Sequence, residues 1–192
     1  MPTPNPAAME FLLTRRSRPA KTLTTPVPAR AALMPILTAA GRSPDHGKLE
    51  PWRFIVLERN ALDRLARLVE QRGAALGKSQ EDIDKARRAY ADAGLVIAVV
   101  ASPKPSEKIP EIEQSYSAGA VCLALLNAAQ ASGWGANWLT GWASHDRGFC
   151  TQGLDLAPHE TIAGMIHIGT ETSPPPERPR PDIQAITTWV DT

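Results

Sequence analysis

The order of apolar and polar residues along the chain predicts several β-strands. The run Leu95–Val100 is continuously apolar and rich in β-branched residues, which is typical of a strand in the middle of a sheet. Trp52–Leu57 and Thr161–Ile168 predict two further strands, and Ala136–Leu139 predicts another extended segment. Because its Phe-Ile-Val-Leu core is uninterrupted, Trp52–Leu57 is expected to be buried on both faces.

The segments before the first strand predict two helices. The first covers residues 7–15, begins near Asn5-Pro6 and buries Phe11-Leu12-Leu13. The second covers residues 29–40 and ends at Gly41. It contains Pro35, which lacks the N–H that a regular helix uses and costs about 3 kcal/mol there. We therefore expect this helix to be kinked or shortened.

Two amphipathic helices are predicted between the first two long strands, starting at the signals Asn60-x-x-Asp63 and Ser79-x-x-Asp82. Further on, Ser144 is expected to cap a short helix that runs toward Gly153. The longest helix is predicted from about Glu111 to Ser132. Since it is apolar almost all round, it belongs either at the centre of the protein or in a subunit interface.

After Glu171 the chain becomes rich in proline and cannot form regular helix or interior strand. We expect residues 171–192 to form an extended arm. Its apolar Ile183, Ile186, Trp189 and Val190 indicate that the arm docks on another surface. Strands separated by helices indicate one layered α/β or α+β domain over residues 1–192, and the apolar helix and arm favour a dimer in which the arm crosses to the partner.

Composition narrows the classes of protein. With 192 residues the chain is long enough for one well-buried domain, and a net charge of +1 gives no overall field for nucleic acid or a membrane. Cys122 and Cys150 lack the spacing of a zinc site or a disulfide framework, and the histidines lack metal-ligand spacing. No segment reads as a secretory signal or a membrane span. We expect a metal-free protein in the cytoplasm.

The residues that carry chemistry form two basic clusters. Arg15-Arg16-Ser17 follows the first helix, and Arg42-Ser43-Pro44-Asp45-His46 precedes the strand that begins at Trp52. Guanidinium groups and a hydroxyl suit a phosphate, because the guanidinium fork donates paired, charge-assisted hydrogen bonds. Taken alone, such a cluster is more often solvated surface at a helix end. The two clusters are spaced so that they can approach opposite ends of one elongated anionic ligand.

Together with later motifs, these clusters resemble the nitroreductase family of FMN enzymes, in particular its short YdjA-like branch. The resemblance covers nearly the whole chain. Besides both clusters it rests on the following motifs in order: Pro51-Trp52-x-Phe54, Ser117-Ala118-Gly119-Ala120, Gly133-Trp134-Gly135, Trp138-x-Thr140-Gly141 and Ile168-Gly169-Thr170.

The resemblance implies an interlocked homodimer with a flavin at the subunit boundary. It assigns Arg15, Arg16 and Ser17 to the phosphate and ribityl chain, and Arg42 and His46 to a contribution from the other subunit. It also implies that Leu139, Thr140 and Gly141 line the flavin ring. The stretch implied for nicotinamide-nucleotide binding consists of Ala129, Gln130, Ala131, Ser132, Gly133 and Trp134.

Two positions depart from the family pattern. Pro35 lies where relatives continue a helix, and Leu139 lies where a near relative has an arginine beside the flavin. Without another cation, the site would stabilise reduced flavin less well. Arg178 or Arg180 on the arm is a further candidate for the phosphate.

The resemblance implies an oxidoreductase in which FMN takes electrons from NADH or NADPH and passes them to nitroaromatics, quinones or similar electron-poor acceptors. This agrees with the absence of a catalytic triad or a carboxylate pair from the sequence motifs. A flavin carrier or sensor with little turnover is the main alternative. A flavin-fragmenting or dehalogenating relative is a third possibility.

Overall fold

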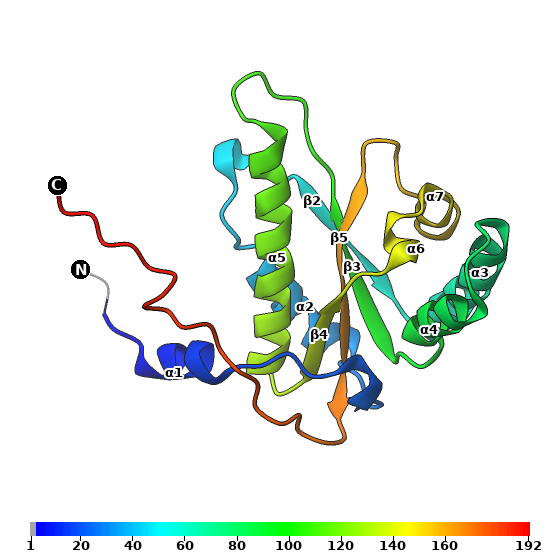
Figure 1. Cartoon of the computed structure of the whole chain (residues 1–192), viewed down its shortest axis with the longest axis horizontal. Helices are drawn as coiled ribbons and strands as arrows, with labels where there is room; N and C mark the ends of the chain where they lie inside the picture. Colours follow the sequence, from blue (N-terminus) through cyan, green and yellow to red (C-terminus); the bar gives the residue numbers. More distant parts are fainter. Residues whose placement is uncertain (1–2) are drawn as a thin grey trace.

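The computed structural model describes residues 3–192 and contains an antiparallel sheet between two layers of helices (Figure 1). This is the mixed helix and sheet fold that the sequence predicts. The sheet has five strands: β1 (Leu23–Thr24), β2 (Trp52–Leu57), β3 (Leu95–Ala101), β4 (Gly135–Leu139) and β5 (Thr161–Glu171).

The longest strand, β5, holds the sheet together. It pairs with β3 along one edge and with β4 and then β1 along the other, while β2 lies beyond β3. Every residue of β3 is buried, which confirms the predicted central strand. The predicted burial of β2 on both faces is wrong, because β2 forms an edge of the sheet and Val56 is exposed. An apolar run alone does not distinguish an edge strand from a central one.

One face of the sheet is covered by α2 (Arg30–Ala40) and α5 (Glu111–Ala131) (Figure 1). The predicted shortening of α2 at Pro35 is wrong, since α2 continues for five residues beyond it. The long helix α5 buries a stripe that includes Val121, Cys122 and Leu125, whereas Leu123 is exposed. None of the helices within residues 3–192 is both long and apolar enough to cross a membrane.

The other face is covered by α3 (Arg59–Ala75), α4 (Gln80–Ala91), α6 (Trp142–His145) and α7 (Arg147–Leu154). Ser79 caps α4, as predicted, by accepting a hydrogen bond from Asp82 N at 3.2 Å. Two other predicted caps are wrong. Asn60 lies inside α3, and α7 is capped by Asp146, whose carboxylate accepts from Phe149 N at 2.8 Å, while Ser144 belongs to α6. Two short 3-10 helices complete the chain, η1 (Ala20–Thr22) and η2 (His46–Lys48).

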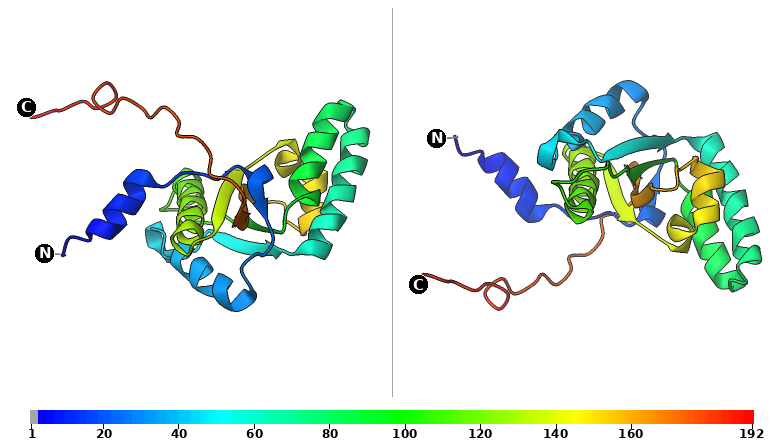
Figure 2. Two further views of the ribbon diagram at one scale, coloured as in Figure 1. Left: turned by 90° about the horizontal axis from the view of Figure 1, so that it is seen from below. Right: turned by 90° about the horizontal axis from the view of Figure 1, so that it is seen from above.

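Both ends of the chain extend away from this body on the same side (Figures 1 and 2). The first helix, α1 (Pro6–Thr14), is capped by Asn5, which confirms the predicted start. The prediction that this helix buries one side is wrong within one chain, because α1 has no buried residue and Leu13 is 75% exposed. Beyond Glu171 the chain has neither helix nor strand, and Trp189 is 89% exposed. The apolar residues of this C-terminal arm do not dock on their own chain.

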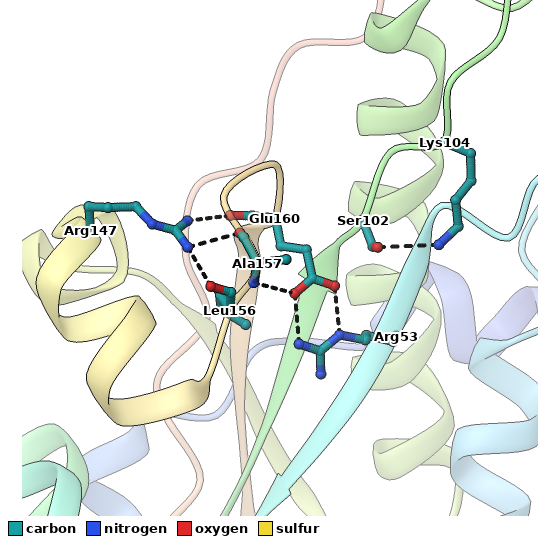
Figure 3. Close-up of polar contacts among 7 residues, drawn as sticks. All are labelled: Arg53, Ser102, Lys104, Arg147, Leu156, Ala157 and Glu160. Atoms are coloured by element: carbon teal, nitrogen blue, oxygen red, sulfur yellow. Dashed lines mark hydrogen bonds and ion pairs between the residues drawn. The ribbon is translucent and has the colours of Figure 1, made fainter.

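A polar network fixes the loop that leads into β5 (Figure 3). Arg53 on β2 donates to both carboxylate oxygens of Glu160, at 2.7 and 2.8 Å, and Ala157 N donates to the same carboxylate at 3.0 Å. Arg147 on α7 donates to the backbone oxygens of Ala157 and Glu160, both within 2.9 Å. The hydrogen bonds from Arg53 are the main cause that lowers the pKa of Glu160 to about 2.

This network predicts a specific loss of stability at low pH. Because the folded pKa of Glu160 lies below its unfolded value, its stabilising contribution is present above pH about 4.5 and is lost as the pH falls toward about 2. Glu160→Gln is expected to lower the free energy of unfolding at pH 7 by about 2 kcal/mol. Urea unfolding between pH 7 and pH 3 measures both effects.

The matched control is Glu70→Gln, which removes a carboxylate from the exposed pair with Arg87 at 3.4 Å. This variant is expected to change stability by less than about 0.5 kcal/mol. Equal losses in the two variants would show that the Arg53–Glu160 pair has no special role.

Candidate active site

A cavity of about 570 Å³ lies on the side of the sheet that carries α4. Its floor includes Met165 and His167 from β5 and Leu139 from the end of β4. The wall continues through Thr140, Gly141 and Trp142 into α6. The structure therefore brings together the three residues predicted to line the flavin ring. Its remaining walls are formed by η1, through Ala20 and Lys21, and by α4, through residues that include Lys85, Ala86, Arg88, Ala89 and Tyr90.

Strand register decides which side chains face this cavity. Leu139 is directly opposite Met165, and Asn137 is directly opposite His167. Residues opposite each other in an antiparallel pair share a face of the sheet, so these four point to the cavity side. The alternate residues, such as Ile166, join the core beneath α5.

Charge is absent from the floor of the cavity at neutral pH. Burial lowers the pKa of His167 to about 4, so its imidazole is neutral. Burial is also the main cause that raises the pKa of Tyr90, which keeps its hydroxyl protonated. Neighbouring Leu139 and Met165 are apolar. The floor is therefore suited to a flat, uncharged ring system.

The basic cluster after α1 lies close to the end of α5. Gln130 of α5 donates from Nε2 to the backbone oxygen of Arg16 at 2.6 Å. Arg15 Nη2 donates to Ser17 Oγ at 3.4 Å. The buried Nε of Arg15 and the buried Nη1 of Arg16 have no hydrogen-bond acceptor in residues 3–192. Buried guanidinium donors normally have partners, so this cluster has capacity for an anion.

Like charges surround Arg15. Its pKa is lowered by burial first, then by the charges of Arg180 and Arg18. Arg180 comes from the C-terminal arm, where its guanidinium donates to Glu177 at 3.0 Å. Of the two arm residues predicted as candidates for the phosphate, Arg180 therefore acts electrostatically on the cluster. The role of Arg178 stays a prediction.

One short segment connects this cluster to the cavity. Arg18 N donates to Ala136 O at 2.9 Å, and Asn137 Nδ2 donates to Arg18 O at 2.7 Å. These bonds fix the segment against β4. Two residues later the chain enters η1, where Ala20 and Lys21 line the cavity. One continuous segment thus carries the unpartnered guanidinium donors at one end and forms part of the cavity wall at the other.

The second basic cluster lies at the other end of α5. Ser117 Oγ donates to Pro44 O at 2.7 Å, and His46 Nδ1 is 2.6 Å from Glu113 Oε2. Ser117 and Gln130 are thirteen residues apart on α5, which corresponds to about 20 Å at a rise of about 1.5 Å per residue. Arg42 and His46 therefore do not join Arg15 within one chain. Their contribution from another subunit stays a prediction.

The segment predicted to bind the nicotinamide nucleotide forms the end of α5 and the turn after it. Ala129 is buried in the core, and Gln130 holds the backbone of Arg16. Gly133 has a φ of +84° in the turn that follows α5, a conformation that favours glycine. Ala131 and Ser132 are exposed, and Trp134 packs against the core beneath α5. None of these residues lines the cavity, so their predicted role stays a prediction.

Sequence reasoning missed several cavity residues. Trp134 and Trp138 belong to the family motifs, but both face α5, and Trp142 is the tryptophan that lines the cavity. His167 lines the cavity, although the spacing of the histidines in the sequence gave it no functional role. Alternate residues of a strand share a face, so Met165 and His167 lie on the same face of β5. Only the pairing of β5 with β4 shows that this face is the one toward the cavity. Lys21 had no distinguishing signal in the sequence.

Other chemistry finds little support in the described part of the chain. No group of three or more His, Cys, Asp or Glu side chains there could hold a metal ion. Cys122 and Cys150 are both free and buried. Burial raises the pKa of the Cys122 thiol to about 12, which leaves it protonated and a poor nucleophile.

Comparison with known proteins identifies the family. The family model described as "Nitroreductase family" matches residues 12–170, which include the residues of the cavity and both basic clusters. The chain belongs to the nitroreductase family. It is 37% identical over 163 residues to an Escherichia coli (strain K12) protein named provisionally as the NAD(P)H nitroreductase YdjA, with 85% of this chain and 87% of the relative covered.

A second relative and two solved structures agree with this assignment. A Haemophilus influenzae protein, also named provisionally as an NAD(P)H nitroreductase, is 40% identical over 165 residues, covering 85% of this chain and 88% of its own. A nitroreductase-like protein from Bacillus cereus superposes with a TM-score of 0.80 at 21% identity over the whole of both chains. A nitroreductase-type protein from Desulfovibrio desulfuricans, solved with FMN, has a TM-score of 0.73 at 20% identity, covering 99% of this chain and 100% of its own. Both structures support the nitroreductase fold.

The buried His167 predicts a second pH window. Its folded pKa of about 4 lies below the unfolded value of about 6.5, so the unfolded chain binds more protons between these values and stability falls as the pH falls through them. For a shift of this size the loss is about 3 kcal/mol. His167→Asn is expected to remove most of this loss, as measured by urea unfolding from pH 7 to pH 4.

His145→Asn serves as the control, because His145 is exposed. It is expected to leave the pH dependence of the parent chain unchanged. If His167→Asn retains the full loss between pH 6.5 and pH 4, the buried imidazole is not its source.

Proposed function

We propose that this chain is an oxidoreductase that binds FMN and transfers electrons from NADH or NADPH to electron-poor acceptors such as nitroaromatics or quinones. The observation that carries the proposal is the pair of buried, unpartnered donors on Arg15 and Arg16, connected by one segment to a cavity with an uncharged floor. The FMN bound by a structural neighbour and the names of the two relatives support it.

The basic cluster fits the phosphate of FMN. Arg15 and Arg16 supply guanidinium donors, and Ser17 supplies a hydroxyl within 3.4 Å of Arg15. A dianionic phosphate would offset the repulsion among Arg15, Arg18 and Arg180, which is the electrostatic cost of assembling this cluster. The cluster thus has both the geometry and the charge for an anion.

The cavity fits the flavin ring. Its volume of about 570 Å³ is within the range of about 300 to 1,000 Å³ that is usual for ligand sites. When bound there, FMN would accept a hydride from the nicotinamide donor and pass electrons to the acceptor. Leu139, Met165 and Trp142 would exclude water from the ring. The side chain of Lys21 would place a positive charge at the margin of the site, where it favours negative charge on the ring.

The departure at Leu139 therefore does not leave the site without cations. Lys21, Lys85 and Arg88 all line the same cavity. This favours turnover over the alternative of a flavin carrier. Steady-state oxidation of NADH with an artificial acceptor separates the two, since a carrier would be yellow but almost inactive.

We further propose that the protein works as a homodimer with the flavin site at its interface. Apolar side chains are exposed on α1, on the outer face of α5 and on the C-terminal arm, including Leu13, Leu123 and Trp189. An exposed apolar surface of this extent is typical of an interface. A second copy would also supply Arg42 and His46, whose segment is tethered to α5 about 20 Å along the helix from the tether of the Arg16 segment.

The phosphate assignment predicts the effect of removing Arg15. Arg15→Gln removes a charge-assisted contact of about 1.5 to 3 kcal/mol and is expected to weaken FMN binding roughly ten- to a hundredfold. Arg42→Ala is expected to have a similar effect through the second subunit. Titration of the flavin-free protein with FMN, followed by the visible spectrum, measures both.

Arg67→Gln is the matched control, because Arg67 is exposed on α3, on the other face of the sheet from α5 and the Arg15 cluster. Its FMN affinity should equal that of the parent. A colourless parent protein that does not respond to FMN would reject the proposed function, and an unchanged affinity in Arg15→Gln would reject the phosphate site.

The interface assignment predicts the effect of a charge on α5. Leu123 is 44% exposed and Leu76, at the end of α3, is 46% exposed, so the two positions differ mainly in the surface that they occupy. Leu123→Glu is expected to produce monomers, because it places a carboxylate in the interface, whereas Leu76→Glu should remain dimeric. Light scattering after gel filtration distinguishes the two masses, and a dimeric Leu123→Glu would contradict this interface.

A further inference from the structure

The rim of the cavity carries cations that its floor lacks. Lys21, Lys85 and Arg88 all line it, and none of them has a carboxylate oxygen within 4.0 Å in residues 3–192. Two acidic residues, Asp82 and Asp92, also line the cavity. The carboxylate of Asp82 accepts a hydrogen bond from Ser79 Oγ at 2.8 Å within the cap of α4. With three cations against two carboxylates, the rim carries an excess of one positive charge.

The arrangement on α4 differs between its two sides. Away from the cavity, polar groups have partners: Arg87 pairs with Glu70 at 3.4 Å, and Gln80 donates to Asp84 at 2.9 Å. Toward the cavity, Lys85 and Arg88 have none. These two residues are three positions apart and so lie on the same side of the helix. Of the three cations on α4, the two without an ion pair are thus the two that line the cavity.

Small side chains leave room beside these cations. Ala86 and Ala89 line the same wall of the cavity, next to Lys85 and Arg88. Because an alanine extends only one carbon from the backbone, a planar ligand can approach this part of α4 closely. The long Lys and Arg side chains can then reach over it from the rim.

We propose that Lys85 and Arg88 form a subsite for an anionic oxygen group on the planar ligand that enters the cavity to exchange electrons. This inference rests on the proposed function. Two sources carry that chemistry: a carboxylate or sulfonate on an aromatic acceptor, and the phosphates of the nicotinamide donor. A neutral floor combined with a cationic rim selects a ligand with an uncharged ring and a charged substituent.

The cofactor's own phosphate is a poor candidate for this subsite. FMN has one phosphate, and the buried donors of Arg15 and Arg16 lie at the end of α5, next to Gln130. Lys85 and Arg88 lie on α4, which lines the cavity and covers the face of the sheet opposite to α5. The two cationic groups therefore serve different anions.

The test uses the flavin-loaded protein and ligand pairs that differ only in charge or in the presence of phosphate. The acceptor pair is 4-nitrobenzoate and 4-nitrobenzamide, and the donor pair is reduced nicotinamide mononucleotide and reduced nicotinamide riboside. We compare the parent with Lys85→Gln/Arg88→Gln, and use Arg87→Gln as the control on the other side of α4. Calorimetric titration of the oxidised protein with 4-nitrobenzoate and 4-nitrobenzamide adds an equilibrium readout that does not depend on turnover.

In the double variant, the preference for the charged member of at least one pair, measured as a ratio of kcat/KM values, is expected to fall about tenfold. The pair that responds identifies the source of the anion, and a response of the acceptor pair should be matched by the calorimetric affinities. Arg87→Gln should keep the parent ratios.

Two results would overturn the subsite. One is a double variant that binds flavin normally and keeps both ratios within twofold of the parent. The other is a fall in flavin affinity with unchanged ratios, which would assign these cations to the cofactor. Failure of the proposed function is distinguishable from both, because in that case the parent protein itself binds no flavin.

Discussion

Pairing along both edges of β5 is the constraint on which the site depends. One edge pairs with β3 and so joins the strand to the buried core, while the other edge pairs with β4 and β1. This double pairing fixes the register, and a slip of one residue would exchange the two faces of the strand. Met165 and His167 would then face α5, and Ile166 would line the cavity. The chemistry of the floor is therefore a consequence of the sheet.

The length of α5 imposes the second constraint. The helix tethers one basic segment near each end, through Ser117 and Gln130, and these tethers are about 20 Å apart. No side-chain rotation within one chain closes such a gap. A site that uses both segments needs a second copy, and the exposed apolar surfaces of α1 and α5 supply a physical reason for two copies to associate. Subunit association and cofactor binding are then parts of the same event.

The sequence predicted most elements because their signals are local. The β-branched run of β3 and the cap at Ser79 each depend on neighbouring residues only. The errors arose where the outcome depends on distant partners. Whether β2 is an edge strand depends on what pairs beyond it, and Asp146 replaced Ser144 as a cap because its carboxylate also binds Arg72 at 2.7 Å. The family resemblance was enough to assign Leu139–Gly141 to the cavity. The position of Trp142 in the cavity wall could be found only from the folded structure.

The distribution of charge around the cavity follows from burial. In the buried part of the lining, ionised groups would lose their hydration, so His167 on the floor is neutral and Tyr90 in the α4 wall keeps its proton. At the rim, Lys85 and Arg88 are exposed, and their long side chains extend to solvent. A cation at position 139 would have to be buried in the floor beside Met165. Leucine at this position is thus consistent with a site that confines its positive charge to the margin, where a ligand's anion can meet it without desolvating the floor.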